Sequence, residues 1–165
     1  QLGALMAFTA ARGVKLQHCK PHGSLYNMAA KDMDLSLAIA EAIVEVDKNI
    51  ILMGLAGSKM LEAGRQMGLR VASEVFADRA YQADGSLVPR KQPGAVIHDK
   101  DEAIARTIRM VTEGKVTAIT GEEVSIDAHS ICVHGDNPSA VEFVKNIRAS
   151  LSAQGVEIAP IAEIV

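Results

Sequence analysis

The chain has 165 residues, of which 48% are hydrophobic and 22% charged, and its net charge is −3. These totals are typical of one globular α/β domain over residues 1–165, and they exclude a disordered chain. Because there is no basic block, no apolar run of membrane length and no signal peptide, we expect no nucleic-acid partner, no membrane segment and a cytoplasmic protein. Cys19 and Cys132 lie in apolar segments and predict buried free thiols, which suit a reducing compartment.

The first eleven residues are predicted to form a helix that is already under way, since no initiator Met precedes them. Leu2, Leu5, Met6 and Thr9 share one face of this helix. We therefore expect that the front of a larger domain is missing from the chain. A strand over residues 14–19 follows, and it ends in a loop because Pro21 and Gly23 interrupt the pattern.

The rest of the chain alternates between short apolar strands and amphipathic helices. Helices are expected to begin at four capping residues: Asp34, Ser58, Asp99 and Asn137. Strands are expected over residues 50–53, 71–76, 116–119, 130–133 and 156–158. Almost wholly apolar strands between amphipathic helices indicate a parallel sheet covered by helices. About six strands are too few for an eight-stranded barrel, so an open sheet and a barrel without its first units both stay open.

A connection of roughly twenty residues separates the strand at 71–76 from the helix that begins near Asp99. Connections of this length without periodicity are uncommon in compact domains and are often functional. This one carries Asp78, Arg79, Tyr81 and Arg90, a mixture of charges that a passive connector does not need. We therefore place the centre of the functional site in this loop.

Polar residues follow the predicted strands at the points where each strand ends. They are Lys20 and His22, Gly54 and Gly57, Glu74 to Arg79, Glu122, and His134 with Asp136. Because the carboxyl ends of parallel strands lie on one rim, we expect a single active site there.

Each of these residues also has a purely structural interpretation. His22 could cap a turn, and Asp136 could interact only with a helix dipole. Glu74 could form a buried ion pair with Arg79 or Lys20. Gly54, Gly57 and Ser58 precede a helix and could bind a phosphate through backbone N–H groups, but they could equally form only a tight turn between strand and helix.

Three segments together resemble the LamB/YcsF family: residues 20–27 (KPHGSLYN), residues 74–90 (EVFADRAYQADGSLVPR) and residues 133–136 (VHGD). The resemblance covers essentially the whole chain. It implies an incomplete parallel β/α barrel of the glycoside hydrolase/deacetylase type. Members of this family begin with segments N-A-D-L-G-E, F-H-A-G-D and H-P-S, which are absent here. This implies that N-terminal units are missing, that residues 1–165 form the C-terminal part of a larger barrel, and that the chain is not catalytically complete.

The same resemblance implies lactam utilization, as the A subunit of a 5-oxoprolinase that opens 5-oxoproline to L-glutamate with ATP and two partner subunits. A homo-oligomer is also compatible with the sequence. The residues that we expect to carry catalysis are Lys20, His22, Glu74, Asp78, His134 and Asp136. Arg79, Arg90 and Tyr26 are expected to bind the substrate, since arginine can hold a carboxylate bidentately.

Two other functions remain open at this point. His22, His134 and Asp136 could hold a divalent metal ion such as Zn²⁺ or Mn²⁺ in a deacetylase or amidohydrolase, although no spacing here is diagnostic of a metal site. Alternatively, the rim could only present substrate to a catalytic partner subunit. No G-x-x-x-x-G-K-[ST] loop occurs, so the position of ATP is not defined by a motif.

Overall fold

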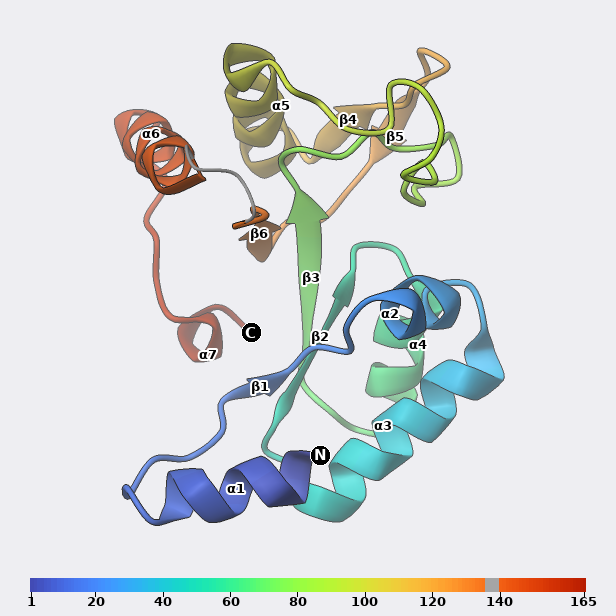
Figure 1. The fold of residues 1–165 in the computed structure, drawn as a ribbon, viewed down its shortest axis with the longest axis vertical. Coiled ribbons are helices and arrows are strands. Elements are labelled where there is room, and N and C mark those ends of the chain that lie inside the picture. The colour runs from blue at the N-terminus through green and yellow to red at the C-terminus, as the bar shows by residue number, and fades with distance from the viewer. Residues whose placement is uncertain (136–139) are drawn as a thin grey trace. The chain divides into compact units, whose positions relative to one another are not determined.

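The structure is a computed structural model that describes residues 1–135 and 140–165 (Figure 1). The chain divides into two compact units, residues 1–73 with 161–163 and 165, and residues 74–160 with 164. The strands of the main sheet follow the order β1-β2-β3-β6. Strand β3 (Val71–Phe76) contributes its first residues to one unit and its last residues to the other. The prediction of a single domain stays a prediction.

The first unit contains α1 (Leu2–Ala10), β1 (His18–Cys19), α2 (Ser24–Ala29), α3 (Met33–Asp47), β2 (Ile51–Leu55) and α4 (Lys59–Gln66). β1 and β2 are parallel, with His18 opposite Ile51. α3 packs against α4. Helix α4 comes close to the strands at Gly64, where an added Cβ would lie 2.6 Å from Val71 Cγ1. Only glycine fits at this contact.

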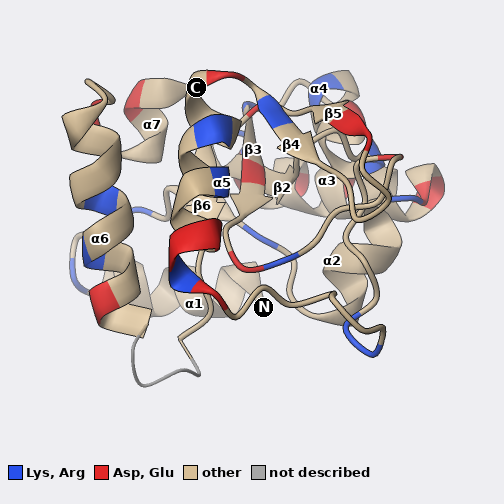
Figure 2. Cartoon of the chain, turned by 90° about the horizontal axis from the view of Figure 1, so that it is seen from above, with Lys and Arg blue, Asp and Glu red and all other residues tan. Residues whose placement is uncertain are grey.

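The second unit contains α5 (Lys100–Thr112), β4 (Lys115–Thr117), β5 (Glu123–Ser125), β6 (Ser130–Cys132) and α6 (Ala140–Ala153). β3 and β6 are parallel, with Glu74 opposite Ser130. Ala77, Ala103 and Phe143 belong to the core in which α5 and α6 meet. Figure 2 shows the acidic residues of α5 at its first turn and its arginines farther along, an order that suits the helix dipole.

Strand β3 spans the residues predicted for it, and α5 begins at its predicted cap, where Asp99 accepts a hydrogen bond from the Glu102 amide (2.9 Å). Other predictions were wrong in detail. Asp32, not Asp34, caps α3, because its side chain accepts from the Leu35 amide (3.0 Å). The expected strand over 14–19 is confined to His18–Cys19.

The predicted strand at 116–119 does not join the parallel sheet. It forms β4, which pairs antiparallel with β5 after a turn at Gly121, where φ is +100°. Glu122 therefore lies in an exposed hairpin and not at the end of a parallel strand, which corrects its predicted place on the rim. Residues 156–158 form no strand, and α7 (Ile161–Ile164) follows. The predicted cap at Asn137 lies outside the described residues.

Candidate functional site

The loop over residues 77–99 folds back on itself in the second unit. The Ile97 amide donates to the Asp78 carbonyl (2.9 Å), and the Ala80 amide donates to the Ala95 carbonyl (3.0 Å). Ala80, Val88 and Ala95 form a small buried cluster inside the loop. A long connection thus becomes a fixed platform that begins where β3 ends.

Two buried side chains hold this platform in place. The Arg79 guanidinium donates to the carbonyls of Val88 (2.6 Å) and Ala95 (3.3 Å). The Tyr81 hydroxyl accepts a hydrogen bond from the Phe76 amide at the end of β3 (2.8 Å). Burial lowers the pKa of Arg79 and raises the pKa of Tyr81. Both polar groups therefore connect the loop to itself or to the strand.

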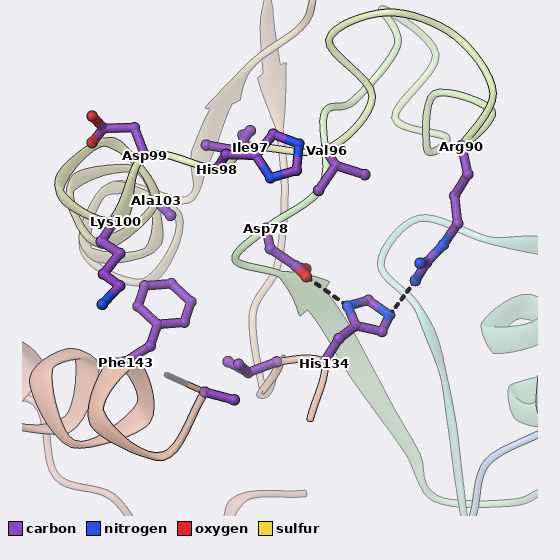
Figure 3. Close-up of a pocket in the computed structure, with 12 residues that line it drawn as sticks. Asp78, Arg90, Val96, Ile97, His98, Asp99, Lys100, Ala103, His134 and Phe143 are labelled. Carbon is purple, nitrogen blue, oxygen red and sulfur yellow. Dashed lines mark hydrogen bonds and ion pairs between the residues drawn. The ribbon is translucent and has the colours of Figure 1, made fainter. Parts of the chain in front are cut away.

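Asp78, His134 and Arg90 form one hydrogen-bonded chain (Figure 3). His134 Nδ1 lies 2.7 Å from Asp78 Oδ2, and its Nε2 lies 2.6 Å from an Arg90 guanidinium nitrogen. A guanidinium only donates hydrogen bonds, so Nε2 must be the acceptor and Nδ1 must carry the proton. The geometry therefore fixes a neutral His134 with its Nδ1–H directed at the Asp78 carboxylate.

This chain of side chains borders a pocket of about 290 Å³, at the small end of the range for ligand sites. Asp78, Arg90 and His134 line it together with His98 and Lys100. The imidazole of His134 also stacks on the Phe76 ring, with 6.0 Å between centroids and an interplanar angle of 27°. The pocket thus combines an oriented imidazole with cationic groups suited to a small anionic ligand.

The second carboxylate oxygen of Asp78, Oδ1, differs from Oδ2 in its hydrogen bonding. Oδ1 is buried and has no hydrogen-bond partner among the residues that the structure describes. A buried acceptor without a donor costs about 1–3 kcal/mol, and such groups are retained mainly where function requires them. The Asp78 side chain is 20% exposed and that of His134 is 27% exposed, so both are accessible in part.

The first unit holds another group of predicted site residues. Lys20 Nζ lies 5.4 Å from the centre of the Tyr26 ring, a cation–π contact. Tyr26 is 4% exposed on α2, whereas His22 is exposed just before that helix. These residues belong together locally.

The structure thus brings Asp78, Arg90 and His134 together. Arg79 lies beside Asp78 in sequence, but its guanidinium binds backbone carbonyls. Glu74 is buried on β3, with 3% of its surface exposed. Asp136 lies outside the described residues. The single rim that would join Lys20, His22 and Tyr26 to this group stays a prediction, and so do the catalytic and substrate-binding roles.

Metal binding was expected as an alternative at His22, His134 and Asp136. Among residues 1–135 and 140–165, no group of three or more His, Cys, Asp or Glu side chains could hold a metal ion. Both ring nitrogens of His134 are already engaged, by Asp78 and by Arg90. His134 could therefore ligate a metal only after one of these hydrogen bonds broke.

Two residues that line the pocket, His98 and Lys100, are not among the site residues expected from the sequence. Both flank Asp99, the residue that caps α5. The signal was present: the end of a long functional loop that runs directly into a helix N-terminus is a common place for ligand contacts.

The family model for LamB/YcsF matches residues 1–165. The chain belongs to the LamB/YcsF family. It is 63% identical over 158 residues to a protein of Alkaliphilus metalliredigens named as the A subunit of 5-oxoprolinase, covering 96% of this chain and 62% of that protein. A protein of the same name from Pyrococcus furiosus is 52% identical over 165 residues, covering 100% of this chain and 65% of the relative. The chain thus spans less than two thirds of these relatives.

A solved structure of this family has the same fold. The crystal structure of a lactam utilization protein from Thermus thermophilus matches with a TM-score of 0.86 and 44% identity, covering 96% of this chain and 63% of that one. The family resemblance and the predicted fold class, an incomplete parallel β/α barrel, are confirmed. No helix in the described part of the chain is long and apolar enough to span a membrane.

Proposed function

We propose that this chain forms part of the A subunit of a 5-oxoprolinase, which hydrolyses 5-oxoproline to L-glutamate with ATP and two partner subunits. The similarity to proteins named as the A subunit of 5-oxoprolinase supports the substrate and the need for partners. The observation that carries the chemistry is the hydrogen-bonded chain of Asp78, His134 and Arg90 at the pocket. The free thiols of Cys19 and Cys132 suit the reducing cytoplasm, where we place the reaction.

A lactam amide is a poor electrophile, which is why the reaction consumes ATP. The lactam oxygen attacks the γ-phosphorus, ADP leaves, and the ring carbon becomes electrophilic. Water then adds to this carbon, and its proton passes to a base. When the ring C–N bond breaks, the nitrogen takes up a proton, and hydrolysis of the resulting acyl phosphate releases glutamate and phosphate.

Within this scheme, His134 Nε2 is the proton acceptor and Asp78 holds the imidazole in the required tautomer. Arg90 binds the carboxylate of 5-oxoproline, because Arg79 is committed to backbone carbonyls whereas Arg90 is exposed and lines the pocket. Lys20, His22, Glu74 and Asp136 remain proposed contributors. We assign the nucleotide site to one of the partner subunits, because this chain has no phosphate-binding loop motif.

The test uses the full-length protein assembled with its partner subunits, with glutamate release measured in the presence and absence of ATP. Asp78→Asn should lower the rate by about 10²–10³-fold, since an amide cannot hold His134 in the same tautomer as a carboxylate does. The control is Asp101→Asn, which removes the same charge from an exposed position on α5 and should retain full activity.

Two outcomes would overturn the proposal in different ways. Glutamate release that needs no ATP and is abolished by a chelator would favour a metal-dependent amidohydrolase. Full activity of the Asp78→Asn complex would show that catalysis does not depend on Asp78 or on the tautomer that it holds.

A further inference from the structure

The proposed base is not free in the structure. The lone pair of His134 Nε2, which would accept a proton from water, already accepts a hydrogen bond from Arg90 (2.6 Å). The opposite nitrogen donates to Asp78 and cannot take this role. As long as Arg90 stays in place, the imidazole has no site for a second proton. Something must therefore remove Arg90 before His134 can act.

We propose that Arg90 masks His134 until the carboxylate of an anionic lactam draws the guanidinium away, so that substrate binding itself releases the base. This inference rests on the proposed function and adds a rule for substrate selection. Arg90 would act twice, first as a cover on Nε2 and then as the carboxylate-binding group.

The surroundings of Arg90 allow such an exchange. Its side chain is exposed at the pocket. Arg79, which lies close enough for the two guanidinium charges to repel each other, holds the Val88 carbonyl two residues before Arg90. The backbone near Arg90 is therefore anchored while its side chain keeps its freedom. Repulsion between the two cations also favours an anion between or beside them.

The exchange is favourable on chemical grounds. In the structure the guanidinium donates to a neutral imidazole, whereas a substrate carboxylate would offer two charged acceptor oxygens in the geometry of the guanidinium fork. The bond to the imidazole is assisted by one charge only, whereas the carboxylate adds a second hydrogen bond and the attraction between opposite charges. A carboxylate can therefore compete for Arg90, but an uncharged ligand cannot.

This predicts the class of substrate. Cyclic amides with a carboxylate on the carbon next to the ring nitrogen should release the base. 2-Pyrrolidinone, which is 5-oxoproline without its carboxylate, should enter the pocket and leave Nε2 covered. Discrimination between these two ligands would then come from the rate of the reaction as well as from affinity.

The kinetic test compares 5-oxoproline with 2-pyrrolidinone in the full complex. In Arg90→Ala we expect kcat/KM for 5-oxoproline to fall at least about 30-fold, mainly through KM, while kcat/KM for 2-pyrrolidinone rises because its base is no longer covered. The preference for the carboxylated lactam should therefore fall at least about 30-fold. Lys91→Ala removes a neighbouring exposed charge that does not line the pocket, and it should keep the wild-type preference.

A second measurement needs neither substrate nor activity. In the full-length protein with ¹⁵N-labelled histidine, the Nε2 signal of His134 should report an accepted hydrogen bond, and Arg90→Ala should move it toward a free imidazole nitrogen. His134→Asn identifies the signal by its loss. Identical spectra for wild type and Arg90→Ala would show that Arg90 does not cover Nε2.

The two ways of failing are separable. A wild-type complex that releases no glutamate from 5-oxoproline refutes the proposed function, whatever the spectra show. An active complex whose substrate preference is unchanged in Arg90→Ala refutes only the masking of His134 by Arg90.

Discussion

The loop over residues 77–99 and the segment over residues 20–27 both carry polar residues of the family pattern, but they use them differently. In the loop, Arg79 and Tyr81 are buried and bonded to backbone groups, which fixes the positions of Asp78 and Arg90. In the segment, Lys20 lies over the Tyr26 ring and His22 is exposed. The difference teaches that one sequence motif can combine residues that hold the loop in shape with residues that face the pocket.

The largest expected effect is at Arg79, which holds the loop through backbone carbonyls. Arg79→Leu should lower the free energy of unfolding by about 2–4 kcal/mol. The Val88 carbonyl loses this donor at about 1–3 kcal/mol, and the Ala95 carbonyl, which keeps the Ala80 amide, loses one of two hydrogen bonds at about 0.5–1.5 kcal/mol. Urea unfolding of the full-length protein measures this. Arg65→Ala, an exposed position on α4, is the control and should change stability by less than about 0.5 kcal/mol. Unchanged stability with a raised KM would make Arg79 a substrate-binding residue.

Tyr81→Phe tests the junction between the loop and β3. The change removes only the hydroxyl that accepts a hydrogen bond from the Phe76 amide, so this link between the loop and the strand is lost. We expect a loss of about 0.5–1.5 kcal/mol in unfolding free energy, the usual contribution of one hydrogen bond. Urea unfolding measures this as well. If stability were unchanged, the loop would not depend on this hydrogen bond, and the contrast with segment 20–27 would weaken.

Lys20→Met tests the other side of the comparison. The change removes a cation–π contact worth about 0.5–1 kcal/mol, so the loss of this contact alone should lower stability by about that amount. If Lys20 also stabilises charge during catalysis, glutamate release by the complex should fall about tenfold, which corresponds to about 1.4 kcal/mol. Tyr26→Leu is the matched variant, since it removes the contact and keeps the charge. Equal losses of activity in both would reduce Lys20 to a structural role.

Much of the fold could be predicted because it depends on local patterns. The apolar run of β3 and the cap at Asp99 are visible in the sequence, and both are found where expected. The β4–β5 hairpin was not predicted because each of its strands has only three residues, too few to show a clear alternating pattern. The turn residues Thr120 and Gly121 between two strand-like segments were the available signal.

The site could be predicted only as a set of residue types. Arg79 and Arg90 occur eleven residues apart in the same motif, and nothing in the sequence tells which one is bonded to the backbone. That distinction depends on how the loop folds, because the carbonyls that Arg79 contacts belong to Val88 and Ala95. The role of His134 likewise becomes definite only when both partners of its ring are known.

The smallest expected effect concerns Glu123 on the β4–β5 hairpin, which belongs to neither the loop over residues 77–99 nor the segment over residues 20–27. Its carboxylate accepts from both Arg109 terminal nitrogens, one of them at 3.0 Å, and from Thr117 (2.9 Å). The hydrogen bonds from Arg109 and then from Thr117 lower the pKa of Glu123 below its ordinary value of 4.5. The stabilisation is therefore complete above pH 4.5 and disappears as the pH falls below it.

Glu123→Gln should accordingly lower the melting temperature by about 1–3 °C at pH 7, and the difference from wild type should shrink steadily as the pH falls below 4.5. Exposed ion pairs contribute little because water and salt screen them, and 1 M NaCl should shrink the difference further. Glu157→Gln, at another exposed position, is the control. A difference that did not change as the pH falls below 4.5 would mean that Glu123 stabilises the hairpin through packing of its side chain and not through its charge.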